Sequence, residues 1–185
     1  RDFREARRTL FRVVDEIISL KRAHVGRSDD LLSMFMEARD EDTAERMSDE
    51  QLRDEVVTML LAGHETSATV MAWLVIELAA RPEMWARLGE EAAAGDLPTS
   101  PRELRRFPFA EALFRETLRL HPPAAMDARV VTGELALHGR PVPPGTMVGV
   151  SLAHLSRHPA VFTDGDAFLP ARWLARTQPI SPLEM

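Results

Sequence analysis

The sequence predicts a mainly helical α+β fold, in which a long central helix and its neighbours precede a small sheet of short antiparallel strands. Up to residue 120, apolar residues recur at helical spacing, and capping residues and prolines bound each segment. From residue 129 onward, short β-branched stretches alternate with glycine and proline turns. Helices that come first and strands that come later indicate an α+β layout and not an alternating parallel one.

Composition narrows the class of protein. The chain has 185 residues, of which 45% are hydrophobic and 28% charged, as in a folded domain or a part of one. Its net charge of −6 argues against nucleic-acid binding. It contains no cysteine, which excludes disulfides, zinc–thiolate sites and thiol nucleophiles built from this chain. No secretory leader follows the first residue, so we expect a cytoplasmic protein.

The N-terminal segment, residues 1–24, predicts an amphipathic helix that ends near Gly26. Ser28-Asp29-Asp30 then predicts the cap of a short second helix. Several arginines of the first helix would suit a membrane surface or an acidic partner. Acidic residues lie between them, which favours a solvated helix face. These arginines are Arg1, Arg4, Arg7, Arg8 and Arg12.

The strongest predicted element is a long helix. Ser48 and Gln51 form a capping-box pattern, and the helix can run to Ala80 before Pro82 forces a break. About thirty residues give a length of roughly 45 Å. The central part, 56–76, is long enough to cross a bilayer, but Glu65 near its middle would cost about 3 kcal/mol. We therefore expect a mostly buried helix with one polar notch and no membrane segment.

The notch is the stretch Ala62-Gly63-His64-Glu65-Thr66. Glycine inside a helix costs about 1 kcal/mol relative to alanine, so Gly63 needs a reason, such as the close approach of a ligand to the backbone. The Thr66 hydroxyl can bond the Ala62 carbonyl and open the helix locally into a groove. Glu65 and this hydroxyl could then relay protons to a bound ligand. A polar patch packed against polar neighbours remains the alternative.

The rest of the chain divides into short elements. We expect helices over Pro82 to Ala94 and Phe109 to Leu120, strands at 129–131, 134–137 and 147–150, and a helical turn within 151–158. Glu116 and Arg119 lie three residues apart on one helix face and can pair. An exposed pair of this kind contributes less than about 1 kcal/mol, but apolar neighbours indicate that this pair is buried.

Three motifs occur in a fixed order. They are Ala62-Gly63-His64-Glu65-Thr66-Ser67, then Glu116-Thr117-Leu118-Arg119-Leu120-His121-Pro122-Pro123, then Phe168-Leu169-Pro170-Ala171-Arg172-Trp173. Together they resemble the cytochrome P450 heme-thiolate monooxygenases. The resemblance covers nearly the whole chain, whereas the family's domain is more than twice as long. We therefore expect residues 1–185 to be a partial cytochrome P450 domain that is incomplete at both ends.

The resemblance implies a role for each matching residue. Ala62 and Gly63 would line the oxygen-binding groove over the heme, and Glu65 and Thr66 would be the acid–alcohol pair that delivers protons during the reaction. Arg129 would meet a heme propionate.

The second and third motifs imply a structural cluster. Glu116 and Arg119 would form the family's E-x-x-R pair, joined by Arg172, because a carboxylate between two guanidinium groups can offset the cost of its burial. Pro143-Pro144-Gly145 would form a turn between strands. Arg157-His158-Pro159 stands where the family often has Arg-Asp-Pro.

The family also implies a reaction and its partners. Heme b would be the cofactor, one atom of O2 would enter a small organic substrate, and a ferredoxin or a reductase would supply two electrons. The family's cysteine loop should follow Trp173, and it is missing from this chain, so the axial thiolate that promotes O–O cleavage is absent. We expect the isolated segment to be inactive.

Two alternatives come from other classes. The segment could be a catalytically inactive fragment or a helical binding module without heme. A hydrolase that uses Glu65 with Glu116 has little support, because Glu116 is committed to arginines. A zinc protease is excluded, because Ala68 stands where the H-E-x-x-H motif requires its second histidine.

Overall fold

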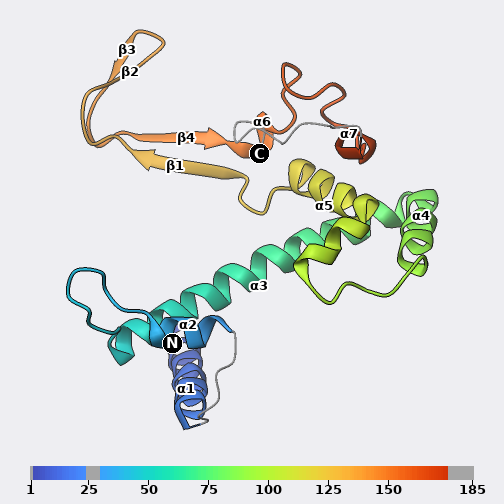
Figure 1. Cartoon of the computed structure of the whole chain (residues 1–185). Helices are drawn as coiled ribbons and strands as arrows, with labels where there is room; N and C mark the ends of the chain where they lie inside the picture. The colour runs from blue at the N-terminus through green and yellow to red at the C-terminus, as the bar shows by residue number, and fades with distance from the viewer. Residues whose placement is uncertain (1, 24–29, 175–185) are drawn as a thin grey trace. The chain divides into compact units, whose positions relative to one another are not determined.

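A computed structural model describes residues 2–23 and 30–174 (Figure 1). It confirms a mainly helical fold with short antiparallel strands. The chain divides into two compact units, residues 1–65 and residues 66–185, and the long helix α3 (Asp49–Ala79) belongs partly to each. Each unit has its own hydrophobic cluster.

The first unit contains α1 (Asp2–Ala23), α2 (Leu31–Glu37) and the beginning of α3. Val14 and Ile18 on α1 pack with Leu52 on α3, which confirms the predicted amphipathic helix. Asp30 caps α2 by accepting a hydrogen bond from the Ser33 amide at 2.9 Å. The predicted helix end at Gly26 and the other two predicted capping residues, Ser28 and Asp29, lie outside the described residues. Around this cluster pack Leu10, Leu32, Phe35, Met36, Met47, Val56 and Val57.

The predicted capping box opens α3. The Ser48 amide donates to Gln51 Oε1 at 2.9 Å, and the Gln51 amide donates to Ser48 Oγ at 3.2 Å. The helix then continues for 31 residues and passes Gly63 without interruption. The local opening that we expected at Gly63 is therefore absent. A single glycine costs about 1 kcal/mol, which a helix of this length tolerates.

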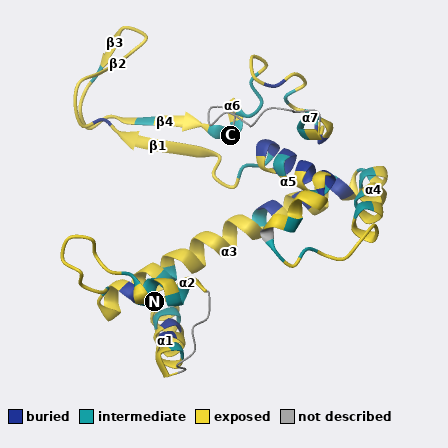
Figure 2. Cartoon of the chain, in the orientation of Figure 1, coloured by how far each residue is buried: buried dark blue, intermediate teal, exposed yellow. Residues whose placement is uncertain are grey.

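The expectation that α3 is buried on most sides is wrong for the described residues. Figure 2 shows most of α3 as exposed. Its buried apolar side chains are Leu52, Val70, Leu74 and Leu78; Leu52 belongs to the cluster of the first unit, and Leu74 and Leu78 belong to that of the second. Within the described part, α3 is also the one helix long and apolar enough to cross a membrane, a property that the core helices of soluble proteins share.

The second unit is built around α5 (Pro108–Leu120). Phe109, Leu113 and Leu120 pack with Leu74 and Leu78 of α3, and Phe168 completes this core. The helix α4 (Pro82–Ala93) begins with proline in its first turn, as predicted, and adds Met84 and Leu88. A 3-10 helix, η1 (Pro101–Arg106), follows, which the sequence did not predict.

The strands form two small sheets and not one. The strand β1 (Met126–Val130) pairs antiparallel with β4 (Met147–Ser151), and β2 (Leu135–Leu137) pairs with β3 (Arg140–Val142). Only two residues separate β2 from β3, so this hairpin pairs with itself, and the sequence did not predict β3. Thr146 donates to the Pro143 carbonyl at 3.2 Å, and Gly145 has φ +85°, as a type II turn requires.

Two short helices complete the described part of the chain. They are α6 (Leu152–Leu155), within the predicted helical turn, and α7 (Ala171–Leu174), which the sequence did not predict. The segment between them returns to α5 and supplies acceptors and donors to its charged residues.

Candidate functional site

Glu116 on α5 is fully buried, and its carboxylate accepts five hydrogen bonds. Its Oε1 accepts from Arg119 Nη2 at 2.7 Å, from the Leu169 amide at 2.8 Å and from Arg172 Nε at 3.0 Å. Its Oε2 accepts from Arg119 Nε at 2.9 Å and from Trp173 Nε1 at 2.7 Å. The structure thus brings together the three residues that the sequence assigned to this cluster.

Arg119 uses every N–H of its guanidinium group. Beyond its two bonds to Glu116, Nη1 donates to the carbonyls of Ser156 and Gly165 at 2.8 and 2.6 Å, and Nη2 donates to the Ala167 carbonyl at 2.9 Å. A guanidinium has five such donors, and all five are satisfied. Arg119 therefore ties α5 to the segment between α6 and α7.

Arg172 on α7 closes the other side of the carboxylate. Its Nη1 donates to the Thr163 carbonyl at 3.1 Å, and its Nη2 donates to the Asp164 carbonyl at 3.4 Å. The guanidinium carbons of Arg119 and Arg172 lie 5.1 and 5.9 Å from the centre of the Phe162 ring, within the range of cation–π attraction. We call Glu116, Arg119, Arg172 and Trp173 the Glu116 cluster.

The electrostatics of the cluster favour an ionised carboxylate. Burial alone raises the pKa of Glu116, but the N–H donors of Arg119, Leu169 and Trp173 together lower that pKa below its usual value. A carboxylate that accepts five hydrogen bonds has its lone pairs occupied. Glu116 therefore holds the structure together and is not available as a base.

Gly165 permits the close approach of two backbone segments. A Cβ atom at this position would lie 2.1 Å from the carbonyl oxygen of Arg157, much closer than atoms can pack. The Gly165 carbonyl is also an acceptor for Arg119. Sequence reasoning missed Gly165 and also the indole donor of Trp173. For the latter a signal exists, because a buried tryptophan N–H requires an acceptor.

A second polar cluster joins the end of α3 to the end of α5. The Nε2 atom of His121 lies 2.7 Å from Glu77 Oε1, while Arg81 Nη1 binds Glu77 Oε2. The rings of Trp73 and His121 are stacked, with centroids 4.1 Å apart and planes 1° from parallel. In the sequence analysis, His121 appeared only as a member of the second motif, directly after the predicted helix.

The residues of the polar notch occupy consecutive turns of α3. Ala62, Gly63, Glu65 and Thr66 are all helical and exposed. No described atom lies within 4 Å of the place that a Cβ of Gly63 would take. Within the described chain, this glycine therefore makes no close approach to another segment.

Arg129, the residue expected to meet a propionate, lies on β1 with its side chain 79% exposed. Its Nη1 donates to Asp127 Oδ1 at 2.5 Å, and this bond is the main reason that the pKa of Asp127 is lowered. Nη1 also donates to the Ala128 carbonyl at 2.9 Å, and within the described chain no acceptor is recorded for Nε and Nη2. Ala62, Gly63 and Glu65 of the notch belong to the first unit, whereas Thr66 and Arg129 belong to the second.

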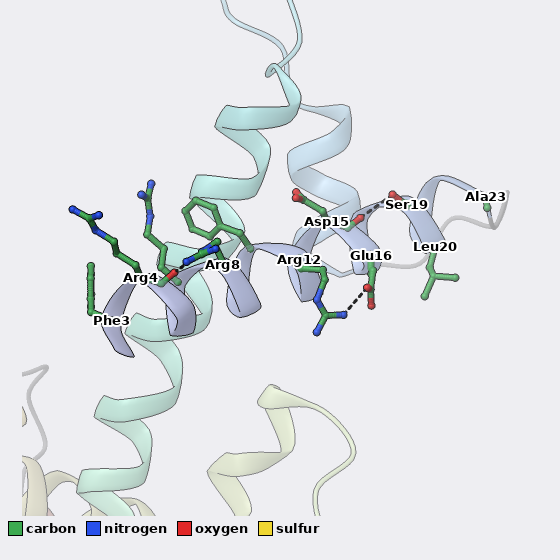
Figure 3. A pocket seen from close by; sticks show the side chains of 11 residues that line it. Phe3, Arg4, Arg8, Arg12, Asp15, Glu16, Ser19, Leu20 and Ala23 are labelled. Atoms are coloured by element: carbon green, nitrogen blue, oxygen red, sulfur yellow. Dashed lines mark hydrogen bonds and ion pairs between the residues drawn. The ribbon is translucent and has the colours of Figure 1, made fainter. Parts of the chain in front are cut away.

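An open hollow on the surface runs along α1 (Figure 3). It contains none of the residues that the sequence assigned to a site, and Arg12 in it pairs with Glu16 at 2.9 Å. The hollow therefore suits the solvated face predicted for this helix.

Among the residues that the structure describes, no group of three or more histidine and acidic side chains could hold a metal ion.

Comparison with known proteins decides the family. The cytochrome P450 family model matches residues 1–184. The chain belongs to the cytochrome P450 family. Among its P450 relatives, the Cytochrome P450 BJ-4 homolog of Sinorhizobium fredii is 43% identical over 168 residues, which cover 89% of this chain and 36% of that protein. Cyclooctat-9-en-7-ol 5-monooxygenase of Streptomyces melanosporofaciens is 36% identical, over 94% of this chain and 38% of its own length.

Solved P450 structures have the same fold. A retinoic acid-bound cyanobacterial CYP120A1 matches with a TM-score of 0.81 at 24% identity, over 92% of this chain and 39% of its own. The heme domain of cytochrome P450DA matches with a TM-score of 0.80 at 30% identity, over 95% of this chain and 41% of its own. The chain thus spans 36–41% of the length of these P450 proteins.

Heme, the cofactor of the P450 family, fits this chain only in part. The exposed guanidinium group of Arg129 suits a carboxylate substituent such as a heme propionate. The axial ligand in this family is a cysteine thiolate, and none of the 185 residues is a cysteine. The residues of this chain therefore do not complete a heme site.

Proposed function

We propose that the chain is part of a heme-dependent monooxygenase, which inserts one oxygen atom of O2 into an organic substrate and reduces the other to water. The Glu116 cluster supports this proposal, since it contains each residue that the family resemblance required, in the expected pairing. In the whole protein, heme b bound to a thiolate from outside this chain would supply the oxygen chemistry. Residues 1–185 would be a partial P450 domain that is incomplete at both ends.

The notch is proposed to handle protons. The Thr66 hydroxyl would donate a proton to the oxygen being reduced, and the Glu65 carboxyl would replace that proton from solvent. The exposure of both side chains on α3 allows such an exchange with water. Ala62 and Gly63, which carry little or no side chain, would leave room for O2 beside the helix.

The remaining site residues would bind the heme or stabilise the fold around it. Arg129 would pair with a heme propionate through the N–H groups that Asp127 leaves free. Glu116, Arg119 and Arg172 would have a structural role, because their hydrogen bonds are directed at one another and at backbone carbonyls.

The proposed partners follow from the reaction. Two relatives, cyclooctat-9-en-7-ol 5-monooxygenase and pentalenene oxygenase, are named for the oxygenation of an organic compound. We infer a small organic substrate here, a ferredoxin or reductase as electron donor, and a cytoplasmic location. Nucleic acid is not expected as a partner of a chain with net charge −6.

The lack of cysteine favours a second function for the 185 residues alone. Without a thiolate they would form a catalytically inactive fragment, or a helical binding module without heme. The largely exposed α3 is consistent with a segment that needs further partners to bury its apolar side chains.

Substitution in the notch tests the proton role. In the whole protein, Thr66→Ala should lower the yield of oxygenated product per electron consumed by about tenfold or more, because a positioned proton donor contributes on the order of 10²-fold. The neighbouring Ser67→Ala is the matched control and should leave the yield unchanged. Equal product yields from the Thr66→Ala and Ser67→Ala proteins would contradict the proposal.

A further inference from the structure

The cluster of Trp73, Glu77, Arg81 and His121 takes no part in the function proposed above. It connects α3 with the residue that ends α5, within the second unit. We propose that it is a protonation-dependent clasp, which holds the end of α3 to the end of α5 more tightly when His121 carries a charge.

The first half of the clasp is a shared carboxylate. Glu77 Oε1 lies 2.7 Å from His121 Nε2, while Oε2 binds Arg81, whose Nη1 also donates to the Glu77 carbonyl at 3.1 Å. An ionised carboxylate only accepts hydrogen bonds, so Nε2 of His121 must carry the hydrogen. The side chains of Glu77 and His121 are 14% and 17% exposed, and their interaction is therefore only weakly screened by water.

The second half is an aromatic stack. The imidazole of His121 lies flat on the indole of Trp73, with ring centroids 4.1 Å apart and planes within 1° of parallel. A cation over the face of tryptophan is attracted by the ring quadrupole, and a neutral ring lacks this attraction. Protonation of His121 therefore adds two favourable interactions, one with the Glu77 carboxylate and one with the Trp73 ring.

Other charges near the clasp oppose this effect only in part. Among the described residues, the charged side chains recorded around the His121 ring are Glu77 and, through it, Arg81. Arg81 also lies with its guanidinium carbon 5.0 Å from the centre of the Phe168 ring, so it is held partly by a different contact. The Glu77 carboxylate binds His121 through one oxygen and Arg81 through the other. Its attraction to each cation therefore acts over a shorter distance than the repulsion between the two cations.

The clasp lies at the C-terminal end of α5. His121 caps α5, which carries Glu116 and Arg119, and the next residues, Pro122 and Pro123, lead towards β1. When His121 loses its proton, the hydrogen bond from Nε2 remains but both charge interactions are lost. We expect the ends of α3 and α5 to be coupled strongly in mild acid and weakly in mild alkali.

A double-mutant cycle measures this coupling directly. Glu77→Gln, His121→Gln and the double variant of the whole protein are unfolded with urea at about pH 5.5 and about pH 8.5, on either side of the range in which histidine usually changes charge. The coupling should multiply the folding equilibrium constant by about tenfold in acid and by twofold or less in alkali. Equal coupling at both pH values, or none at either, would overturn the proposal.

Two further variants keep the test decisive. Trp73→Phe retains an aromatic ring but weakens the cation–π attraction, so its cycle with His121→Gln should show the same pH trend even if a Glu77 variant does not fold. His154→Gln is the matched control, because His154 is exposed and its ring is in edge contact only with His158. Its effect on the folding constant should differ by less than twofold between the two pH values, and a pH trend as large as that of His121→Gln would overturn the assignment to the clasp.

Discussion

Glu116 holds three parts of the second unit together with one carboxylate. Its partners come from α5 itself, from the chain at Leu169 and from α7. Such a buried charge is stable only because each of its lone pairs meets a donor. At the residue scale, the sequence predicted the pairing with Arg119 and Arg172. The other two donors, the Leu169 amide and the Trp173 indole, depend on where the backbone turns.

The first prediction concerns the loss of this charge. Glu116→Gln should destabilise the protein by about 3–5 kcal/mol, because it leaves Arg119 buried without its counter-charge. Glu111→Gln on the same helix is the control, since its pair with Arg115 is largely exposed and should contribute less than about 1 kcal/mol. Urea unfolding of both variants measures the difference. Similar losses of stability would show that burial of the Glu116 pair has no energetic consequence.

The second prediction concerns acid. A carboxyl whose pKa is lower in the folded than in the unfolded protein contributes stability above its unfolded pKa, and that stability is lost as the pH falls through the folded pKa. Because the pKa of Glu116 is lowered, the protein should lose stability progressively below about pH 4.3, the usual value for glutamate. Urea midpoints between neutral pH and pH 3 check this. The Glu116→Gln variant should lose less stability over the same range, and an unchanged acid sensitivity would contradict the assignment.

At the scale of elements, the sequence predicted what local chemistry determines. The Ser48–Gln51 capping box, the proline that opens α4 and the turn at Gly145 are all present as expected. The strand β3 and the 3-10 helix η1 were missed, since both are too short to show a period in apolar residues.

The third prediction belongs to the segment between α6 and α7. Gly165→Ala places a Cβ against the Arg157 carbonyl and should move the segment away from Arg119, with a cost of about 3 kcal/mol or more. Gly133→Ala is the control, because its Cβ would meet no described atom within 4 Å, and it should be neutral or slightly stabilising. Thermal unfolding compares the two. A Gly165→Ala variant as stable as Gly133→Ala would show that the approach of the backbones is not needed.

The candidate site was predictable to different degrees. Within the Glu116 cluster, the pair of Glu116 with Arg119 was predictable from their spacing on α5, and Arg172 was expected from the resemblance to the P450 family, whereas the indole donor of Trp173 was missed. The clasp was not, because Trp73 and His121 are 48 positions apart and only packing brings their rings together. The notch was recognised as a motif, but its expected distortion of α3 was wrong, since local hydrogen-bonding chemistry alone did not interrupt the helix.

At the scale of the whole molecule, the exposed apolar surface of α3 is the main departure from expectation. Leu60, Leu61, Met71, Val75 and Ile76 are each about half exposed. The chain spans 32–41% of the length of the P450 proteins compared with it. Both facts are consistent with the proposal that additional protein and a cofactor cover the long helix.

We propose that this chain supplies the helical frame and the proton-handling notch of a heme-thiolate enzyme, but not its iron ligand. The direct test is the absorption spectrum of the reduced carbon monoxide complex, recorded for the whole protein and for the 185-residue chain mixed with heme. We expect a thiolate-type Soret band for the whole protein and none for the chain. A thiolate-type band from the chain alone, or its absence from the whole protein, would contradict it.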